Sequence, residues 1–424
     1  MSNGSGMMAK KQNSGTLLAP YRVLDLTDQK GWLAGKLLAD LGAEVIKIEK
    51  PGGDPGRNIG PFYHDIPEPE KSLNWFAYNT NKKSITLDIE TADGQEIFKR
   101  LVQKAKFIIE SFSPGYMKSL GLGYDVLNEL NPEVILTSIS DFGQSGPYQG
   151  YKGCDLVDQA MSGVPFQTGD DDRPPLRLPG NQAYQFASLH AAMGTLLAHI
   201  HREVTGKGQH VDVSVQESLS STNLYAIPYW YSARRIMRRS GGKERRMNIS
   251  YRLVYPCKDG FVTARVMVGR GFGALQKRLV EVMDSRSMAE DLKNIDWTKF
   301  GLDTTTQEDI DHWEEVMGKF FVAHTKNELH EMAKKHSLAV VPVFNAKEVI
   351  QYEQLRQRRF WVEVEYPELG SSIIHPGLIA KVTSAEFKRM KRAPLIGEHN
   401  EQIYIDELGL SLEDVMVLQG NHVI

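Results

Sequence analysis

The 424-residue sequence has few cysteines and no long apolar run. Its two cysteines, Cys154 and Cys257, are too few for a disulfide framework or a cysteine-rich zinc site, and this scarcity indicates a reducing cytoplasm. No stretch approaches the roughly 18 consecutive apolar residues that a membrane helix needs. Residues 1–19 are small and polar, without the apolar region of a signal peptide, and predict a flexible tail. We therefore expect a cytoplasmic protein with no membrane segment.

The sequence also lacks an excess of charge of either sign. Its 50 Lys and Arg residues nearly balance its 53 Asp and Glu residues, for a formal net charge of −3. This balance excludes a bulk attraction to nucleic acid or to an anionic membrane, so we expect neither as a partner. A hydrophobic content of 41% is ordinary for a globular protein, and the length predicts two or three domains.

The motifs of nucleotide-binding loops are missing as well. Residues 21–26 and 44–50 read as strands around a helix at 32–43, which predicts a β-α-β unit. The turn before this helix, "TDQKGWLAG", lacks the G-x-G-x-x-G that lets a backbone approach a pyrophosphate. No G-x-x-x-x-G-K-[ST] occurs either. The pattern therefore favours a generic β-α-β unit over a dinucleotide site.

Candidate metal ligands are equally sparse. His190 does not stand four residues from His199 or His201, so the spacing of a helical zinc pair is absent and we predict no metal site. A cysteine–histidine nucleophile pair stays open, although neither cysteine lies in a recognisable motif. The basic cluster at residues 234–246 suits phosphate binding, a solvated loop or a subunit contact equally well.

The sequence does contain a regular alternation of strand and helix patterns. Further strands are predicted at 82–89, 106–112, 133–140 and 209–218, and further helices at 91–105 and 185–203. This alternation predicts an α/β fold with a large parallel sheet. The apolar residues of the last helix mark one of its faces; they are Phe186, Leu189, Met193, Leu196, Leu197 and Ile200.

Changes in composition indicate the domain boundaries. Residues 20–221 form the first part of the large α/β domain, and residues 222–330 form a small α+β domain with its linkers. Residues 331–424 return to the alternating pattern and are expected to complete the large domain.

One further absence concerns acidic residues. No Asp or Glu occurs between Asp172 and Glu203, although the helix at 185–203 begins within this gap. A helix N-terminus stabilises an anion, so this is a position where a catalytic carboxylate would be effective.

Six stretches taken together resemble the family III CoA-transferases, which include formyl-CoA transferase and carnitine CoA-transferase. The resemblance covers about residues 20–410 and extends to one subunit type of the succinyl-CoA:benzylsuccinate CoA-transferases. The stretches are "ADLGAEVIKIEKPGGDPGR", "NTNKKSITLDI", the segment from "IESFSPG" to "GQSGP", "YKGCDLVDQAMSG", "HREVTGKGQHVDVSVQES" and "KRAPLIGEHN".

The resemblance implies an interlocked dimer, in which two chains pass through each other, and coenzyme A (CoA) as the bound thioester. It implies an acyl-CoA and a carboxylic acid as substrates and no metal. Matched by position to the family motifs, the CoA-binding residues of this chain are Lys50, Lys82, Ser111, Phe112 and Lys152.

Family members are similar to one another in using an aspartate at the start of the helix that follows the acid-free gap. This aspartate attacks the donor thioester and forms an anhydride, then an aspartyl-CoA thioester. The matching position holds Tyr184, with Asn181 and Gln182 nearby, and none of these side chains can replace a carboxylate. The related racemases need a histidine at the position of Cys154 and an aspartate in the same gap, so both racemase residues are absent.

Three hypotheses remain. The chain is an autonomous transferase that uses another carboxylate, with Asp155 or Asp158 the nearest in sequence. Alternatively, it is the non-catalytic subunit of a heteromer whose aspartate-bearing paralogue supplies the nucleophile. In the third hypothesis it is a catalytically silent homodimer that binds acyl-CoA.

Overall fold

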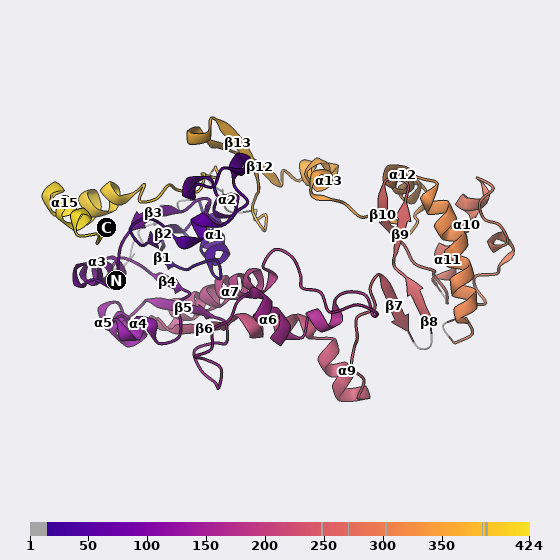
Figure 1. The fold of residues 1–424 in the computed structure, drawn as a ribbon, viewed down its shortest axis with the longest axis horizontal. Coiled ribbons are helices and arrows are strands. Elements are labelled where there is room, and N and C mark those ends of the chain that lie inside the picture. Colours follow the sequence, from indigo (N-terminus) through magenta and orange to yellow (C-terminus); the bar gives the residue numbers. More distant parts are fainter. Residues whose placement is uncertain (1–14, 247–248, 270, 302, 384, 386–388) are drawn as a thin grey trace, which may run out of the picture. The chain divides into compact units, whose positions relative to one another are not determined.

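The chain is divided into two compact units that are not contiguous in sequence. A computed structural model describes residues 15–246, 249–269, 271–301, 303–383, 385 and 389–424 (Figure 1). The first unit comprises the chain up to Val164, Arg177–Ile227 and Gln357–Ile424, and the second comprises Pro165–Leu176 and Pro228–Arg356. The segment that returns to the first unit thus begins at Gln357, where the composition had suggested residue 331.

The predicted N-terminal tail is only partly described. Residues 1–14 lie outside the described residues. Thr16 and Leu18 are buried, and the Leu18 amide donates a hydrogen bond to the Leu41 carbonyl at 3.0 Å. The packed chain therefore begins before residue 20.

A six-stranded parallel sheet forms the centre of the first unit, as the alternating pattern predicted. The strand order is β3-β2-β1-β4-β5-β6, and every neighbouring pair is parallel. The direction of strand progression reverses between β1 and β4, which are neighbours in the sheet. The strands are β1 (Arg22–Leu26), β2 (Glu44–Glu49), β3 (Lys83–Thr86), β4 (Phe107–Glu110), β5 (Ile135–Ser140) and β6 (His210–Ser214).

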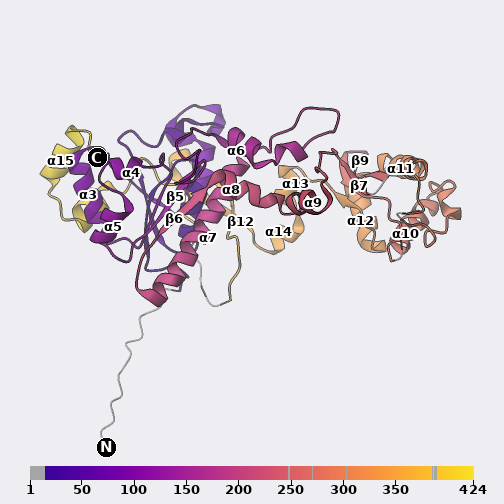
Figure 2. The same cartoon turned by 90° about the horizontal axis from the view of Figure 1, so that it is seen from below.

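Helices cover both faces of this sheet. Alternate strand residues point to opposite faces, so Val23 packs with α1 (Trp32–Asp40) and α7 (Gln182–Thr205), whereas Leu24 packs with α3 (Ala92–Val102) and α5 (Tyr124–Leu130). The C-terminal segment adds the π-helical turn η8 (Gln402–Glu407) and α15 (Leu412–Gly420) to the second face, and α15 lies beside α3 in both views (Figures 1 and 2). The C-terminal segment thus supplies part of the core of the first unit.

The end of the sheet differs from the sequence prediction. The strand predicted at 209–218 ends at Ser214, where α8 (Val215–Ser220) begins. The Ser214 side chain accepts a hydrogen bond from the Glu217 amide and so caps this helix. The alternation of valines extended the predicted strand too far. Val215 continues the apolar pattern, but it is buried as the first residue of a helix.

Helix α7 packs on the sheet through small residues. Ala183, Ala187 and Ala191 are buried, and their short side chains allow the helix to approach the strands closely. The apolar residues that marked one face in the sequence lie mostly outside this contact. Phe186 and Leu196 are half-buried, whereas Leu189, Met193, Leu197 and Ile200 have exposed fractions of 42, 54, 60 and 63%.

The second unit has its own core, in which helices pack on short antiparallel strands. Trp297, Trp313 and Phe320 are among its buried residues. Its strands are β7 (Lys243–Arg246), β8 (Ile249–Arg252), β9 (Val254–Cys257), β10 (Gly260–Thr263) and β11 (Val341–Pro342), and its helices include α10 (Gly273–Asp284), α11 (Gln307–Val322), α12 (Lys326–His336) and α13 (Ala346–Gln351). The second unit thus combines helices with short antiparallel strands.

The remaining elements are short. They are α2 (Leu73–Asn79), α4 (Tyr116–Ser119), α6 (Asp155–Ser162), α9 (Ala226–Ala233), α14 (Glu353–Gln357) and the hairpin of β12 (Trp361–Tyr366) and β13 (Ser371–Pro376). Within the described ranges, no helix combines the length and the apolar character that crossing a bilayer requires.

Candidate active site at the switch point of the sheet

Two cavities adjoin at the carboxyl ends of β1 and β4, the point where the strand order reverses. Such a switch point is where open α/β sheets bind their ligands. Asp28, Ser111 and Phe112 line both cavities. The first cavity, of about 440 Å³, is further lined by residues that include Leu26, Ile48, Lys50, Leu87, Ile89 and Tyr116. The second cavity, of about 500 Å³, is further lined by residues that include Lys30, Ser140, Asp141, Gln149, Lys152 and Gly153.

The residues shared by the two cavities are fixed by short hydrogen bonds between the strand ends. The Ser111 hydroxyl donates to Asp28 Oδ1 at 2.8 Å and accepts from the Asp28 amide at 2.7 Å. The Lys30 ammonium lies 2.8 Å from Asp28 Oδ2. These contacts hold the end of β1 against the end of β4, so the boundary between the cavities has a defined geometry.

The first cavity combines apolar walls with a cation at its edge. The Phe112 ring lies 4.7 Å, centroid to centroid, from the Tyr116 ring. The Lys50 side chain is half-exposed, and its ammonium lies 2.8 Å from Glu90 Oε1. An aromatic and aliphatic wall beside a lysine suits a ligand with a flat apolar part and an anionic part.

Lys152 lines the second cavity and is exposed. No ion pair holds its ammonium within the described part of the chain. Lys50, Ser111 and Phe112 also line these adjoining cavities. The fold therefore places around them four of the five residues that were predicted to bind CoA.

Lys82 lies elsewhere and is fully engaged. Its ammonium is buried and donates to Asp25 Oδ2 at 2.8 Å, to the Trp32 carbonyl at 2.9 Å and to Asn79 Oδ1 at 2.8 Å. Burial lowers the pKa of Lys82 to about 8. The lysine has three donors, and all three are used within the protein. In this structure Lys82 joins β1, α1 and α2 and lines neither of the two cavities.

Tyr184 stands in the first turn of α7. Asn181 is the N-cap of this helix, with a left-handed φ of 52°, and Gln182 is its first residue. Burial, with the charges of Asp141 and Asp158, raises the pKa of the Tyr184 phenol. The phenol therefore stays protonated near neutral pH and is no substitute for a carboxylate nucleophile.

A carboxylate does reach the N-terminus of α7, but it comes from α6. Asp155 Oδ1 accepts a hydrogen bond from the Ala183 amide at 3.0 Å, and Asp155 Oδ2 accepts one from the Gln159 amide group at 2.7 Å. The carboxylate is buried and lines neither cavity. Asp155 thus caps the N-terminus of α7. The sequence did not reveal this role, because Asp155 and Ala183 lie 28 residues apart.

Sequence reasoning missed three charged residues of the site. Asp28 and Lys30 follow β1, and Asp141 follows β5. The signal was present, because polar residues directly after parallel strands meet at the carboxyl edge of a sheet. Asp158, on α6, lies behind Asp141. Burial, followed by the charges of Asp141 and Asp155, raises the pKa of Asp158 to about 8.

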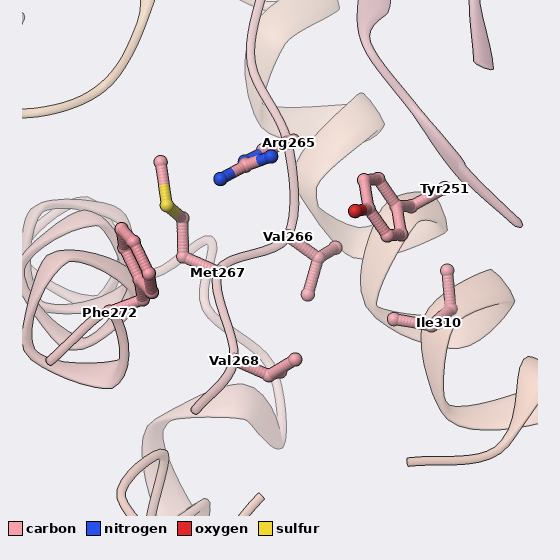
Figure 3. Close-up of a pocket in the computed structure, with 7 residues that line it drawn as sticks. All are labelled: Tyr251, Arg265, Val266, Met267, Val268, Phe272 and Ile310. Carbon is pink, nitrogen blue, oxygen red and sulfur yellow. The ribbon is translucent and has the colours of Figure 1, made fainter. Parts of the chain in front are cut away.

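The remaining features suit neither a metal site nor a second CoA site. In the part of the chain that the structure describes, no three His, Cys, Asp or Glu side chains gather as metal ligands. The second unit has a cavity of only about 70 Å³, between Tyr251, Arg265, Phe272 and Ile310 (Figure 3). The Arg265 guanidinium there lies 3.2 Å from Glu244. This cavity is too small for a CoA ester.

The chain was compared with protein families and known relatives. Residues 18–400 match the model of CoA-transferase family III. The chain is 33% identical to the subunit BbsE of succinyl-CoA:(R)-benzylsuccinate CoA-transferase from Thauera aromatica, over 91% of this chain and 93% of that subunit. It is 31% identical to succinyl-CoA–D-citramalate CoA-transferase from Chloroflexus aurantiacus, over 96% of this chain and 98% of that enzyme.

The fold is likewise that of solved family structures. The crystal structure of a CAIB/BAIF family protein from Brucella suis matches with a TM-score of 0.79 and 26% identity, over 92% of this chain and 99% of that chain. The family that the six sequence motifs indicated is therefore confirmed, and the chain belongs to CoA-transferase family III.

Proposed function

We propose that this chain is the CoA-binding, non-catalytic subunit of a heteromeric transferase that moves CoA between an acyl-CoA and an organic acid. One observation carries the proposal. Four of the five residues expected to bind CoA line the cavities at the switch point, and the first turn of α7, which includes Tyr184, holds no acidic residue.

The two cavities suit the two ends of CoA. The first cavity, with Phe112, Tyr116 and Lys50, has the aromatic surface and the cation that an adenine nucleotide requires. The second cavity leads from the shared residues toward Lys152 and Gly153 and would take the pantetheine arm and the thioester. Gly153 directly precedes Cys154, the N-cap of α6, and Tyr184 binds the first amide of that helix. The thioester would thus lie near the position where the family nucleophile is missing.

The absence of the nucleophile explains why a partner is needed. Forming an enzyme anhydride takes an accessible carboxylate next to the thioester carbon. Asp155 is the nearest acid in sequence, but it is buried and hydrogen-bonded through both oxygens. An autonomous reaction through Asp155 would first have to break the cap of α7, so we favour a partner chain that carries the aspartate.

The surface of the first unit supports a partner. Leu189, Met193, Leu197 and Ile200 form an exposed apolar stripe along α7, at the i, i+4 and i+3 spacings of one helix face. Leu224 and Ile227 are also exposed, with fractions of 76 and 61%. An exposed apolar stripe such as that of α7 indicates a protein interface. We assign it to a second family III chain, interlocked with this one; a second copy of this chain is the alternative occupant.

The test begins with binding and assembly. The purified chain is titrated with free CoA, and it is co-expressed with an aspartate-bearing family III paralogue from the same genome. The proposal predicts that CoA binds, that the two chains copurify, and that only the pair transfers CoA from succinyl-CoA. Transfer by this chain alone would favour an autonomous enzyme. A stable homodimer that binds CoA, with no transfer either alone or with the paralogue, would favour a silent acyl-CoA-binding protein.

A further inference from the structure

The wall of the second cavity contains polar atoms without partners. Ser140 and Asp141 line the cavity, and the fully buried Asp158 lies behind them. The Ser140 hydroxyl, Asp141 Oδ1 and both Asp158 carboxyl oxygens make no hydrogen bond to a donor among the described residues. Buried polar atoms of this kind are costly unless a ligand or a shared proton satisfies them.

Asp141 and Asp158 lie close enough to share a proton. A Cβ placed on Gly153 would lie 2.7 Å from the Cβ of Asp141 and 3.1 Å from Asp158 Oδ1, so both side chains close over the same glycine. The Gly153 amide donates to Asp141 Oδ2 at 3.2 Å. Asp158 is fully buried and its pKa is raised by burial and by the charge of Asp141, so ionising both carboxylates is costly. One proton, held between the two residues, leaves the pair with a single negative charge.

The other charged groups around the pair are few. Lys30 is paired with Asp28 and its charge also acts on Asp141 and Asp158, where it offsets part of the rise in the Asp158 pKa, and Asp155 caps α7. The Tyr184 phenol is neutral, and Lys152 lies at the exposed mouth of the cavity. The elevated pKa of Asp158, about 8, agrees with a retained proton at neutral pH. The inner wall is therefore a hydrogen-bond acceptor with a net negative charge.

We propose that Asp141, with a proton held by Asp158, selects acyl groups that carry a hydrogen-bond donor such as a hydroxyl and disfavours acyl groups that end in a carboxylate. This rests on the proposed CoA-binding function, which places the acyl group beside Tyr184. A hydroxyl donates to the Asp141 carboxylate, whereas a carboxylate of the ligand meets a like charge and finds no donor there. Asp141 contacts the ligand, and Asp158 acts through Asp141 as a positioning residue.

The experiment compares three CoA esters by calorimetric titration of the full chain at pH 6.5. The esters are 3-hydroxybutyryl-CoA, butyryl-CoA and succinyl-CoA. Because a hydrogen bond to a charged acceptor contributes about a factor of ten, we expect 3-hydroxybutyryl-CoA to bind roughly tenfold more tightly than butyryl-CoA, and succinyl-CoA to bind no more tightly than butyryl-CoA. Asp141→Asn should remove this ratio. Asp158→Asn should keep it, because an amide can still donate to Asp141.

The pH profile separates a proton-holding role from a structural role. From pH 6.5 to pH 9 the wild-type pair gains a second charge, so its affinity for succinyl-CoA should fall severalfold, and Asp158→Asn should abolish this change. Asp125→Asn, an exposed residue of α5, is the matched control and should match the wild type throughout. Equal affinities for the three esters, or an unchanged pH profile in Asp158→Asn, would overturn the inference alone. A chain that binds neither CoA nor any ester would overturn the proposed function and the inference with it.

Discussion

Asp155 and Tyr184 cap each other's helices. The Tyr184 hydroxyl accepts a hydrogen bond from the Asp155 amide at 3.0 Å, at the start of α6. The Asp155 carboxylate accepts one from the Ala183 amide, at the start of α7. A tyrosine at this point of α7 therefore supports the fold of the site.

Removing either half of this contact should affect stability more than ligand binding. Asp155→Ala and Tyr184→Phe should each lower the free energy of unfolding by about 1 kcal/mol, the usual cost of a lost helix cap. Urea denaturation measures this loss, and CoA titration of the same proteins should give unchanged affinities. Conversely, a stable Asp155→Asn variant that abolished transfer would identify Asp155 as a nucleophile.

We expect Lys82 to stabilise the fold and not to bind CoA. Lys82→Ala leaves the buried Asp25 without its ion-pair partner, and breaking a buried ion pair in this way costs about 3–5 kcal/mol. The matched control is Lys83→Ala, whose ammonium pairs with the half-buried Glu44 at the surface and should cost less than about 1 kcal/mol. Both are measured by urea denaturation. A stable Lys82→Ala protein with weakened CoA binding would restore Lys82 to the ligand site.

Lys152 should behave in the opposite way. Lys152→Ala should weaken CoA binding by about five- to tenfold, because a cation at the cavity mouth is lost, while the melting temperature stays unchanged. Lys207→Ala, an exposed lysine between α7 and β6, controls for the general loss of positive charge. If both variants bind CoA as tightly as the wild type, the second cavity is not the path of the ligand.

The exposed stripe of α7 should control assembly. Ile200→Glu and Leu197→Glu place a charge in the proposed interface and should reduce the mass found by light scattering to that of a single chain. Leu412→Glu is the control, because Leu412 is equally exposed, at 66%, but lies on α15. Assembly that survives both α7 variants would place the interface on another surface.

The Asp141–Asp158 pair also makes stability depend on pH. Folded Asp158 keeps its proton up to about pH 8, whereas an unfolded aspartate loses it near pH ~4. Folding therefore takes up a proton across this window, and the stability contributed by the protonated group is lost as the pH rises. Asp158→Asn should raise the melting temperature more at pH 8.5 than at pH 5, as scanning calorimetry can measure. An equal change at both pH values would show that Asp158 does not hold the proton.

The sequence predicted the sheet better than it predicted the site. Runs such as "EVIKIE" and "KFIIE" carry apolar residues on both faces, which suits strands buried between two helical layers. The face of α7 was harder to assign, because alanines make the core contact and the larger side chains are exposed. A prediction from hydrophobicity alone places leucine in the core before alanine, but close packing of a helix on a sheet favours the smaller side chain.

The site residues depended on contacts that a sequence does not encode locally. Ser111 and Phe112 could be placed from a strand end, because position along a strand fixes their location at the sheet edge. Lys82 and Asp155 resemble free charged groups in sequence. Their partners, Asp25 and the Ala183 amide, lie 57 and 28 residues away, so only the folded chain reveals that both are engaged.

The most direct test of the account is CoA transfer from succinyl-CoA to a panel of carboxylic acids by the purified chain alone, with and without hydroxylamine. Hydroxylamine intercepts enzyme-bound anhydride and thioester intermediates. The account predicts that the chain binds CoA but transfers none, and that transfer sensitive to hydroxylamine appears only when an aspartate-bearing partner is added. Transfer by this chain alone that hydroxylamine abolishes would contradict it, because a carboxylate of this chain would then be the nucleophile.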